Sequence, residues 1–574
     1  MIARWFPCLL ALFVGGAAHA QAHPGYFGIH VVDASTGRGV PLVELENVGG
    51  TKYYTDSGGW IAIDDPALMN QKVWFNVASH GYQFRADGFG FRGIALDVKP
   101  GGEATLQVTR RNIAERLYRV TGANIYGDSV LLGKPVPTKN PVQNGLVMGQ
   151  DSVGVIPYQG KLFWTWGDTG RFAYPLGNFH MSGATSDFPA RGGLDPSVGV
   201  DLHYYVDENG FSRGMCPIEG PGPVWAAGYM LVPDEAGRRR LVTCWSRMKD
   251  LGTTYERGFS VWSDEAQRFE KHSSFDLSLP LFPAGQSLRV KHGGEAYYYF
   301  TWPYPMIRVK ADWSAIFDPR NYESFTPLAP GSRYVDADSA QVERGPEGRA
   351  VWGWKRDTAF VGPREEAELV RAGKLSDADR LWVLRDVESG SPVFMSAASV
   401  HWNDYRKRWI MIGCQSLGSS MLGEIWFAEA DSPLGPWAYA RKVVTHDKYS
   451  FYNPTQHPYF DQDGGRVIYF EGTYTEAFSG GGVRTPYYDY NQIMYRLSLD
   501  DARLSLPQPV YRLRDGRLLM RKDVVEEKLD DQVAAIDHFA IPPDRPWAGS
   551  ARKWDNPLKI NLKWDLRVEE WPAW

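Results

Sequence analysis

Gly160-Lys161-Leu162-Phe163-Trp164 is a turn, a basic residue and then an apolar-aromatic run, and it decides the fold because it recurs along the chain. Its six copies begin at Lys161, Arg240, Glu295, Arg349, Arg408 and Arg466. The intervals between these starts are 79, 55, 54, 59 and 58 positions. A roughly constant period carried by strands predicts a radial repeat, whose loops around one central channel hold the functional groups.

Each copy is followed by a second apolar segment, which supports an all-β repeat of strand pairs. These segments lie at 202–205, 259–262, 307–309, 381–384, 425–427 and 493–495. The strand pattern of the first and fourth pairs is weak, so the pattern fits either six blades or five blades with an insertion. We expect a β-propeller at 145–515 with a C-terminal tail, 516–574, packed on it. One short helix is expected at 363–372, with Gly373 as its stop.

A separate module is predicted at 23–110, ahead of a connecting stretch at 111–144. Alternating strands flank the turn in DASTGRGVP, 33–41, and Thr55-Asp56-Ser57-Gly58 closes a later strand. These two motifs resemble the carboxypeptidase-regulatory, transthyretin-like β-sandwich. The resemblance implies a small accessory module, for which a spacer or docking role is our default because fold alone does not carry function.

Composition narrows the classes of partner. The chain has 574 residues, which favours two domains, and its formal net charge is only −5, which gives no case for nucleic acid or an anionic membrane. Aromatic residues make up 14% of the chain, with 22 Trp. Some of these rings pack between sheets, and others are candidate platforms for sugars.

The first 20 residues resemble an export signal. Arg4 precedes a short apolar stretch, and Ala18-His19-Ala20 is a small-residue cleavage site. We therefore expect a periplasmic or secreted protein. Three cysteines then remain, and Cys216 with Cys244 is the expected disulfide, with Cys414 as a buried thiol.

No metal or cofactor is expected from the motifs. The chain has no CxxC and no HExxH, and the acidic loop 461–465 lacks the later bidentate Glu of a calcium loop. A structural cation is the weaker alternative.

The strongest local signal for chemistry is Asp151 with Asp168. Asp151 opens one strand and Asp168 closes the next, so a hairpin brings both carboxylates to the same edge. Two close carboxylates can serve as the proton donor and the base or nucleophile of glycoside hydrolysis, and mutual repulsion raises one pKa. The alternative is that both aspartates cap turns.

The motifs around this pair resemble a known family. DSVG, 151–154, then WGDTG, 166–170, and PLGNF, 175–179, are similar to the opening of the propeller glycosidases typified by endo-D-arabinanases. GEIWF, 423–427, SPLGPW, 432–437, and YNPTQHPY, 452–459, resemble later blades of arabinanase-like propellers. The resemblance implies that Asp151 and Asp168 are the catalytic acids and that a furanosidic polymer is the substrate. A long loop at 172–196 and the extra unit near Arg349 depart from the pattern.

Further candidates lie in loops that should face the channel. Glu219, between Gly and Pro residues, is the best third carboxylate, with an ordinary surface loop as the alternative. The candidate substrate-binding residues are Asn178, His180, Trp225, Tyr452, Asn453 and His457. Amides and phenols can both donate and accept hydrogen bonds, and Trp225 and Trp302 are candidate stacking platforms or core residues. His457 either faces a sugar or is a satisfied structural histidine.

Three functions remain open. The leading one is an exported glycoside hydrolase that cuts a polysaccharide or oligosaccharide, with no nucleic-acid partner and no membrane span. The second is a polysaccharide lyase, for which His203, Tyr204, His401 and His457 offer a base next to a uronate. The third is a propeller that binds glycans without catalysis, in which the aspartate pair is structural.

Overall fold

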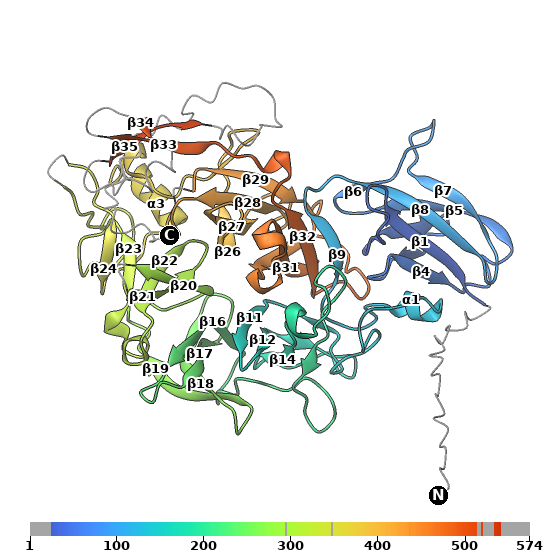
Figure 1. The fold of residues 1–574 in the computed structure, drawn as a ribbon, viewed down its shortest axis with the longest axis horizontal. Helices are drawn as coiled ribbons and strands as arrows, with labels where there is room; N and C mark the ends of the chain where they lie inside the picture. Colours follow the sequence, from blue (N-terminus) through green and yellow to red (C-terminus); the bar gives the residue numbers. More distant parts are fainter. Residues whose placement is uncertain are drawn as a thin grey trace, which may run out of the picture.

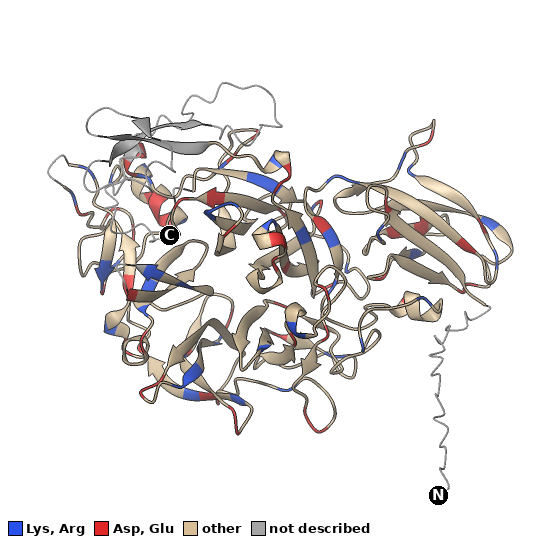
Figure 2. Cartoon of the chain, viewed as in Figure 1, with Lys and Arg blue, Asp and Glu red and all other residues tan. Residues whose placement is uncertain are grey.

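The computed structural model describes residues 25–513, except 293, 294, 346, 347 and 436, together with two short strands at 518–519 and 533–540. The expected signal peptide and most of the expected tail lie outside this range. Within it the chain is mostly β, as Figure 1 shows. No helix of the described part is long and apolar enough to cross a membrane. Figure 2 shows acidic and basic residues interspersed over both parts of the molecule, which agrees with the small net charge.

The N-terminal part consists of two four-stranded sheets around one apolar core. The first sheet has the order β4 (Trp60–Ile63), β1 (Phe27–Asp33), β8 (Glu103–Arg110) and β6 (Tyr82–Gln83). The second has the order β3 (Lys52–Tyr54), β2 (Glu44–Asn47), β5 (Gln71–Ala78) and β7 (Gly93–Val98). In β5 the buried residues alternate with exposed ones, which is why one face of this strand joins the core. Helix α1 (Gly127–Leu131) lies against β4.

The larger part has five successive four- or five-stranded sheets within the described residues, arranged around a common centre in a propeller-like way (Figure 1). The first is β11 (Gly154–Tyr158), β12 (Lys161–Trp166), β14 (Ser182–Ser186) and β15 (His203–Tyr204). The second is β16 (Val224–Pro233), β17 (Arg239–Met248), β18 (Thr254–Ser263) and β19 (Arg268–Phe275).

The third sheet is β20 (Gln286–His292), β21 (Glu295–Thr301), β22 (Pro305–Lys310), β23 (Glu323–Thr326) and β24 (Gly353–Arg356), with α2 (Trp313–Ile316) after β22. The fourth is β26 (Met395–Asn403), β27 (Arg408–Gln415), β28 (Ile425–Ala430), β29 (Tyr439–Val444) and β25 (Arg385–Asp386). The fifth is β30 (Ser450–Gln456), β31 (Val467–Thr475), β32 (Asn491–Ser498) and β9 (Glu115–Arg119). A further sheet combines β33 (Gln508–Leu513), β34 (Leu518–Leu519) and β35 (Val533–Ala540).

Five of the six recurring phrases form the second strand of a sheet, and the phrase at Arg349 does not. Arg349 lies in a loop, and β24 just after it is the outermost strand of the third sheet. The segment 381–384, expected as its partner, is no strand in the structure. The weak fourth strand pair therefore does not form, which leaves the alternative of five sheets with an insertion. The phrase at Arg349 only precedes β24, an outer strand in which Lys355 is the one buried residue. The helix expected next to it is confirmed as α3 (Pro363–Arg371), with Gly373 at φ 68° after its end.

Strand β9 lies inside the stretch expected only to connect the two parts. It pairs antiparallel with β32, and all five of its residues are buried. The chain therefore completes its last sheet with a strand that precedes the first one. The expected boundary at 111–144 was wrong at this point, since a five-residue strand between two polar segments gives a weak pattern.

The expected disulfide is not formed. Cys216, Cys244 and Cys414 are all free and buried. The Cys216 thiol lies 3.9 Å from the Ser260 hydroxyl, whereas the Cys244 thiol faces the Ala227 carbonyl in another apolar cluster. Proximity in sequence was a poor guide because the two cysteines pack in different apolar clusters.

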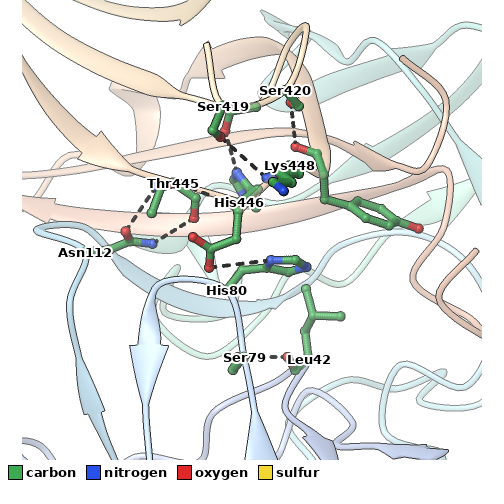
Figure 3. A network of polar contacts seen from close by, with 12 residues as sticks. Leu42, Ser79, His80, Asn112, Ser419, Ser420, Thr445, His446 and Lys448 are labelled. Carbon is green, nitrogen blue, oxygen red and sulfur yellow. Dashed lines mark hydrogen bonds and ion pairs between the residues drawn. The ribbon is translucent and has the colours of Figure 1, made fainter. Parts of the chain in front are cut away.

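The two parts meet through a polar network, part of which is drawn in Figure 3. Asn112 accepts a hydrogen bond from the Thr445 amide at 3.0 Å and donates to the Thr445 carbonyl at 3.4 Å. His80 of the N-terminal part contacts the Tyr474 hydroxyl at 2.9 Å and lies 3.8 Å from the Asp447 carboxylate. We call Asn112, Arg116, His80, His446 and their partners the junction network.

Arg116 is the centre of the junction network. Its side chain is 1% exposed, although it carries a charge. The guanidinium donates to the carbonyls of Pro41, His80 and Leu42 at 3.0, 3.1 and 3.3 Å and to the Ser79 hydroxyl at 2.5 Å. Because these hydrogen bonds satisfy the buried charge, they fix the N-terminal part against β9.

Candidate active site

The innermost strands of the five sheets enclose a cavity of about 470 Å³. Each sheet contributes lining residues, for example Gly154, Ala226, Gln286, Ala398 and Thr455. Residues at or just before the start of these strands line one end of the cavity. Asp151 directly precedes Ser152, which lines this end, but neither Asp151 nor Asp168 is itself among the lining residues.

Asp151 and Asp168 lie next to each other across a short antiparallel pair. Strand β10 (Gly149–Gln150) pairs with β13 (Thr169–Gly170), with Gln150 opposite Thr169. Asp151 follows the first strand and Asp168 precedes the second, so both side chains start from the same edge. This confirms the hairpin argument for their position.

Gly167 makes room for the first carboxylate. A Cβ at this position would lie 2.3 Å from Oδ1 of Asp151, which is far inside van der Waals contact. The Gly167 amide also donates to the Asp151 carbonyl at 2.8 Å. Glycine is therefore required by a close approach, and any other residue would displace the aspartate.

Asp151 is held by two tyrosines and a serine. The Tyr452 hydroxyl donates to its Oδ2 at 2.8 Å, and the Ser152 hydroxyl donates at 3.2 Å. Burial raises the pKa of Asp151, while hydrogen bonds from Tyr452 and Tyr490 oppose this rise. Its Oδ1 is buried and has no partner with good hydrogen-bond geometry in the described structure.

Asp168 is the carboxyl that holds a proton near neutrality. Burial, with the neighbouring Asp151 charge as the second cause, raises the pKa of Asp168 to about 7, and a hydrogen bond from the Trp225 side chain opposes the shift. Like charges at close range disfavour double ionisation, so the pair shares a proton over a wide pH range. The buried Oδ1 of Asp168 also has no hydrogen-bond partner among the described residues.

The backbone around the pair is strained. Ser152, Asn453 and Tyr490 have φ values of 56°, 50° and 61°, in the left-handed region that non-glycine residues seldom adopt. Asn453 donates to the Ser152 hydroxyl at 2.8 Å, which links two of these residues. Such strain persists only where surrounding contacts impose it, and it concentrates at functional sites.

The structure brings together five of the nine candidate residues: Asp151, Asp168, Trp225, Tyr452 and Asn453. Asn178 instead fixes its own loop, because its amide donates to the Met181 carbonyl at 3.0 Å and accepts from the His180 amide at 2.9 Å. Glu219 lies in an exposed loop before β16, and within the described residues no hydrogen bond or ion pair joins it to the aspartates. A catalytic role for Glu219 stays a prediction.

His180 and His457 have different surroundings. His180 follows the Asn178 turn and is half-buried, and burial lowers the pKa of its ring. His457 is 1% exposed and bonds Oε1 of Glu471 at 2.8 Å, with Trp164 and Phe460 against its ring. His457 therefore lies behind the cavity wall, whereas His401 lines the cavity, and burial lowers the pKa of His401 to about 4.

Tyr490 and Ser152 are site residues that the sequence interpretation missed. Tyr490 reaches Asp151 from the segment between β31 and β32, more than 330 positions along the chain. These segments meet only because the last sheet of the propeller-like part packs beside the first. Spacing in the sequence therefore gave no indication of Tyr490. Ser152 stood inside the quoted DSVG motif, but its hydroxyl was given no role.

No group of three or more His, Cys, Asp or Glu side chains that could hold a metal ion occurs in the described part of the chain. The loop 461–465 forms a turn that includes a short 3₁₀ segment, Asp463–Gly465.

None of the protein-family models compared with the sequence matches it, and neither does any curated protein. Solved structures do share similarity. A protein from Bacteroides ovatus is 14% identical with a TM-score of 0.38, covering 62% of this chain and 86% of its own. An α-L-arabinanase from Penicillium chrysogenum is 12% identical with a TM-score of 0.32, covering 67% and 99%. An exo-β-1,3-galactanase from Phanerochaete chrysosporium is 10% identical with a TM-score of 0.32, covering 66% and 64%. These similarities are too remote to carry an argument, so the function is inferred from this chain's own residues.

Proposed function

We propose that this chain is an exported glycoside hydrolase built on a five-bladed β-propeller, with Asp151 and Asp168 as its catalytic pair. The N-terminal part is, in this proposal, a carboxypeptidase-regulatory-like β-sandwich, and residues 1–20 direct export. The substrate is a polysaccharide, with an arabinan-like furanosidic polymer as the first choice because of the DSVG and WGDTG motifs. The observation that carries the proposal is the adjacent, partly buried aspartate pair across β10 and β13, in which the pKa of Asp168 is raised to about 7.

The chemistry follows from the two environments. Asp168 keeps a proton near neutral pH and can donate it to the oxygen of the leaving sugar. Hydrogen bonds from Tyr452 and Ser152 offset part of the rise that burial causes in the pKa of Asp151, and in this proposal Asp151 is the base or nucleophile.

The test is product release from D-arabinan and L-arabinan, followed by chromatography. Asp151→Asn and Asp168→Asn keep shape but remove titration, so each should lower the rate by about 10³-fold. Asp207→Asn is the matched control, because Asp207 caps an exposed turn by accepting from the Asn209 and Phe211 amides. Full activity of both Asn variants on a confirmed substrate would refute the assignment.

A further inference from the structure

A second cleft lies between the N-terminal part and the larger, propeller-like part of the chain. Its volume is about 320 Å³. Its lining includes Tyr53 and Tyr54 of β3, Tyr487 of the larger part, Arg119 and Asp128. We call it the junction cleft; both parts of the chain are needed to form it.

The aromatic walls of the junction cleft are fixed in place. The Tyr54 hydroxyl donates to Oε2 of Glu44 at 2.6 Å, and the Tyr53 ring packs edge-on against Phe75 at 6.3 Å. Tyr487 is 47% exposed and has a φ of 60°, so its ring is presented to solvent from a strained backbone. Rigid half-exposed rings offer contact area at little cost in conformational entropy.

Two buried polar groups line the same cleft. Arg119 is 1% exposed; it donates to the carbonyls of Tyr487 and Ala123, but its Nε has no partner within the described structure. An unpaired buried donor is costly, and a ligand hydroxyl would satisfy it. Burial raises the pKa of Asp128 to about 7, with the nearby Asp56 as the second cause, so this carboxyl can donate or accept a hydrogen bond near neutrality.

Two chain segments run from the junction cleft to the aspartate pair, and an aromatic contact joins them. The Phe172 ring, 59% exposed, contacts the Tyr487 ring edge-on at 6.3 Å. Phe172 belongs to the loop that follows Asp168 and β13, and Tyr490, three positions after Tyr487, hydrogen bonds Asp151. The exposed rings of Phe172 and Tyr487 therefore lie on the two segments that also carry Asp168 and Tyr490 to the aspartate pair.

We propose that the junction cleft is a remote subsite for the same polysaccharide, occupied by sugar units several positions from the bond that is cut. This inference rests on the proposed function, and it gives the N-terminal part a role in substrate binding in place of a spacer role. A pocket with aromatic walls and a few fixed polar groups suits a neutral sugar, whose ring has apolar faces and hydroxyl edges.

The test compares a long polymer with a short oligosaccharide. Tyr53→Ala combined with Tyr487→Ala should raise KM for arabinan about tenfold and leave hydrolysis of a tetrasaccharide unchanged. Tyr405→Ala is the matched control, since Tyr405 is 43% exposed in the turn between β26 and β27. Val130→Trp, which fills the cleft from α1, should reproduce the effect if the double variant does not fold.

A binding assay separates failure of this inference from failure of the proposed function. Asp168→Asn protein should be retarded in gels that contain arabinan, and adding Val130→Trp should abolish the retardation. Unchanged KM in the cleft variants, together with an inactive Asp168→Asn enzyme, would overturn the subsite and leave the hydrolase standing. Retardation that is lost with Val130→Trp, but without hydrolysis by the wild type, would support the cleft and refute the hydrolase. Absence of both retardation and hydrolysis would overturn both.

Discussion

The aspartate pair and the junction network are both largely buried polar clusters, yet they differ in how fully their polar atoms are hydrogen-bonded. In the junction network, Asn112, Arg116, His80 and His446 all have hydrogen-bond partners. In the aspartate pair, Oδ1 of each carboxyl has no partner among the described residues, and three neighbouring residues have left-handed backbones. Satisfied buried groups stabilise a structure, whereas unsatisfied ones persist at the expense of stability. The contrast indicates that the junction maintains the architecture and that the pair is kept for chemistry.

The largest effect should come from the junction. Arg116→Met leaves the carbonyls of Pro41 and His80 without this donor, whereas the Leu42 carbonyl keeps the hydrogen bond from Ser79. At about 1–3 kcal/mol for each unpaired buried acceptor, we expect a loss of about 2–5 kcal/mol in the free energy of unfolding. Chemical denaturation measures this, and activity per folded molecule should stay unchanged. A loss below about 1 kcal/mol would mean that Arg116 does not hold the junction.

Replacing Asp168 should change the free energy of unfolding in the opposite direction. Its pKa of about 7 in the folded protein lies above the ordinary 3.8, so the folded state binds the extra proton and loses stability as the pH rises from about 4 to 7. Asp168→Asn removes this penalty, and the variant should be more stable than the wild type by about 3–4 kcal/mol at pH 8 and nearly equal at pH 4. Unfolding at both pH values provides the comparison, and equal differences would refute the raised pKa.

His446 should give the reverse pH dependence. Burial, with His80 as the second cause, lowers the pKa of His446 to about 3, and Arg116 and Asp447 also face the ring. The unfolded chain binds a proton below pH 6.5, so stability falls by about 1.4 kcal/mol per pH unit as the pH drops from 6.5 towards 3. In His446→Gln this contribution disappears. If the wild type and the variant lose stability in parallel below pH 6, His446 is not buried in its neutral form.

A smaller, purely catalytic effect is expected from Tyr490→Phe. The Tyr490 hydroxyl helps to hold the pKa of Asp151 down, so its removal should raise that pKa and shift the acidic limb of the activity profile upwards. The rate near pH 6 should fall about tenfold, with little change in unfolding. A profile that keeps its shape would exclude Tyr490 from tuning Asp151.

A reducing agent should leave the thermal stability of the protein unchanged. Cys216, Cys244 and Cys414 are free thiols, so the melting temperature should be the same with and without dithiothreitol. A fall in melting temperature on reduction would show a disulfide that the structure lacks.

The sequence predicted the proximity of the two aspartates and most of the repeat. Turn–aromatic phrases located the second strand of all five sheets, because each such strand is buried on both faces and reads as a continuous apolar run. The hairpin argument put Asp151 beside Asp168, since that proximity is local. Sequence interpretation failed at Arg349, where the same phrase precedes an outer strand, and at Cys216, which packs in a different apolar cluster from Cys244 and forms no disulfide with it.

Local pattern alone determined the all-β class, the helix at 363–371 and the paired aspartates, because each depends on residues within about 20 positions of one another. Tertiary structure decided the rest. Strand β9 completes the last sheet from more than 370 positions away, and Tyr452 and Tyr490 reach Asp151 only once the last sheet packs beside the first. The junction cleft exists only where the two parts of the chain meet. Contacts between distant segments arise from packing of whole sheets, and no local spacing encodes them.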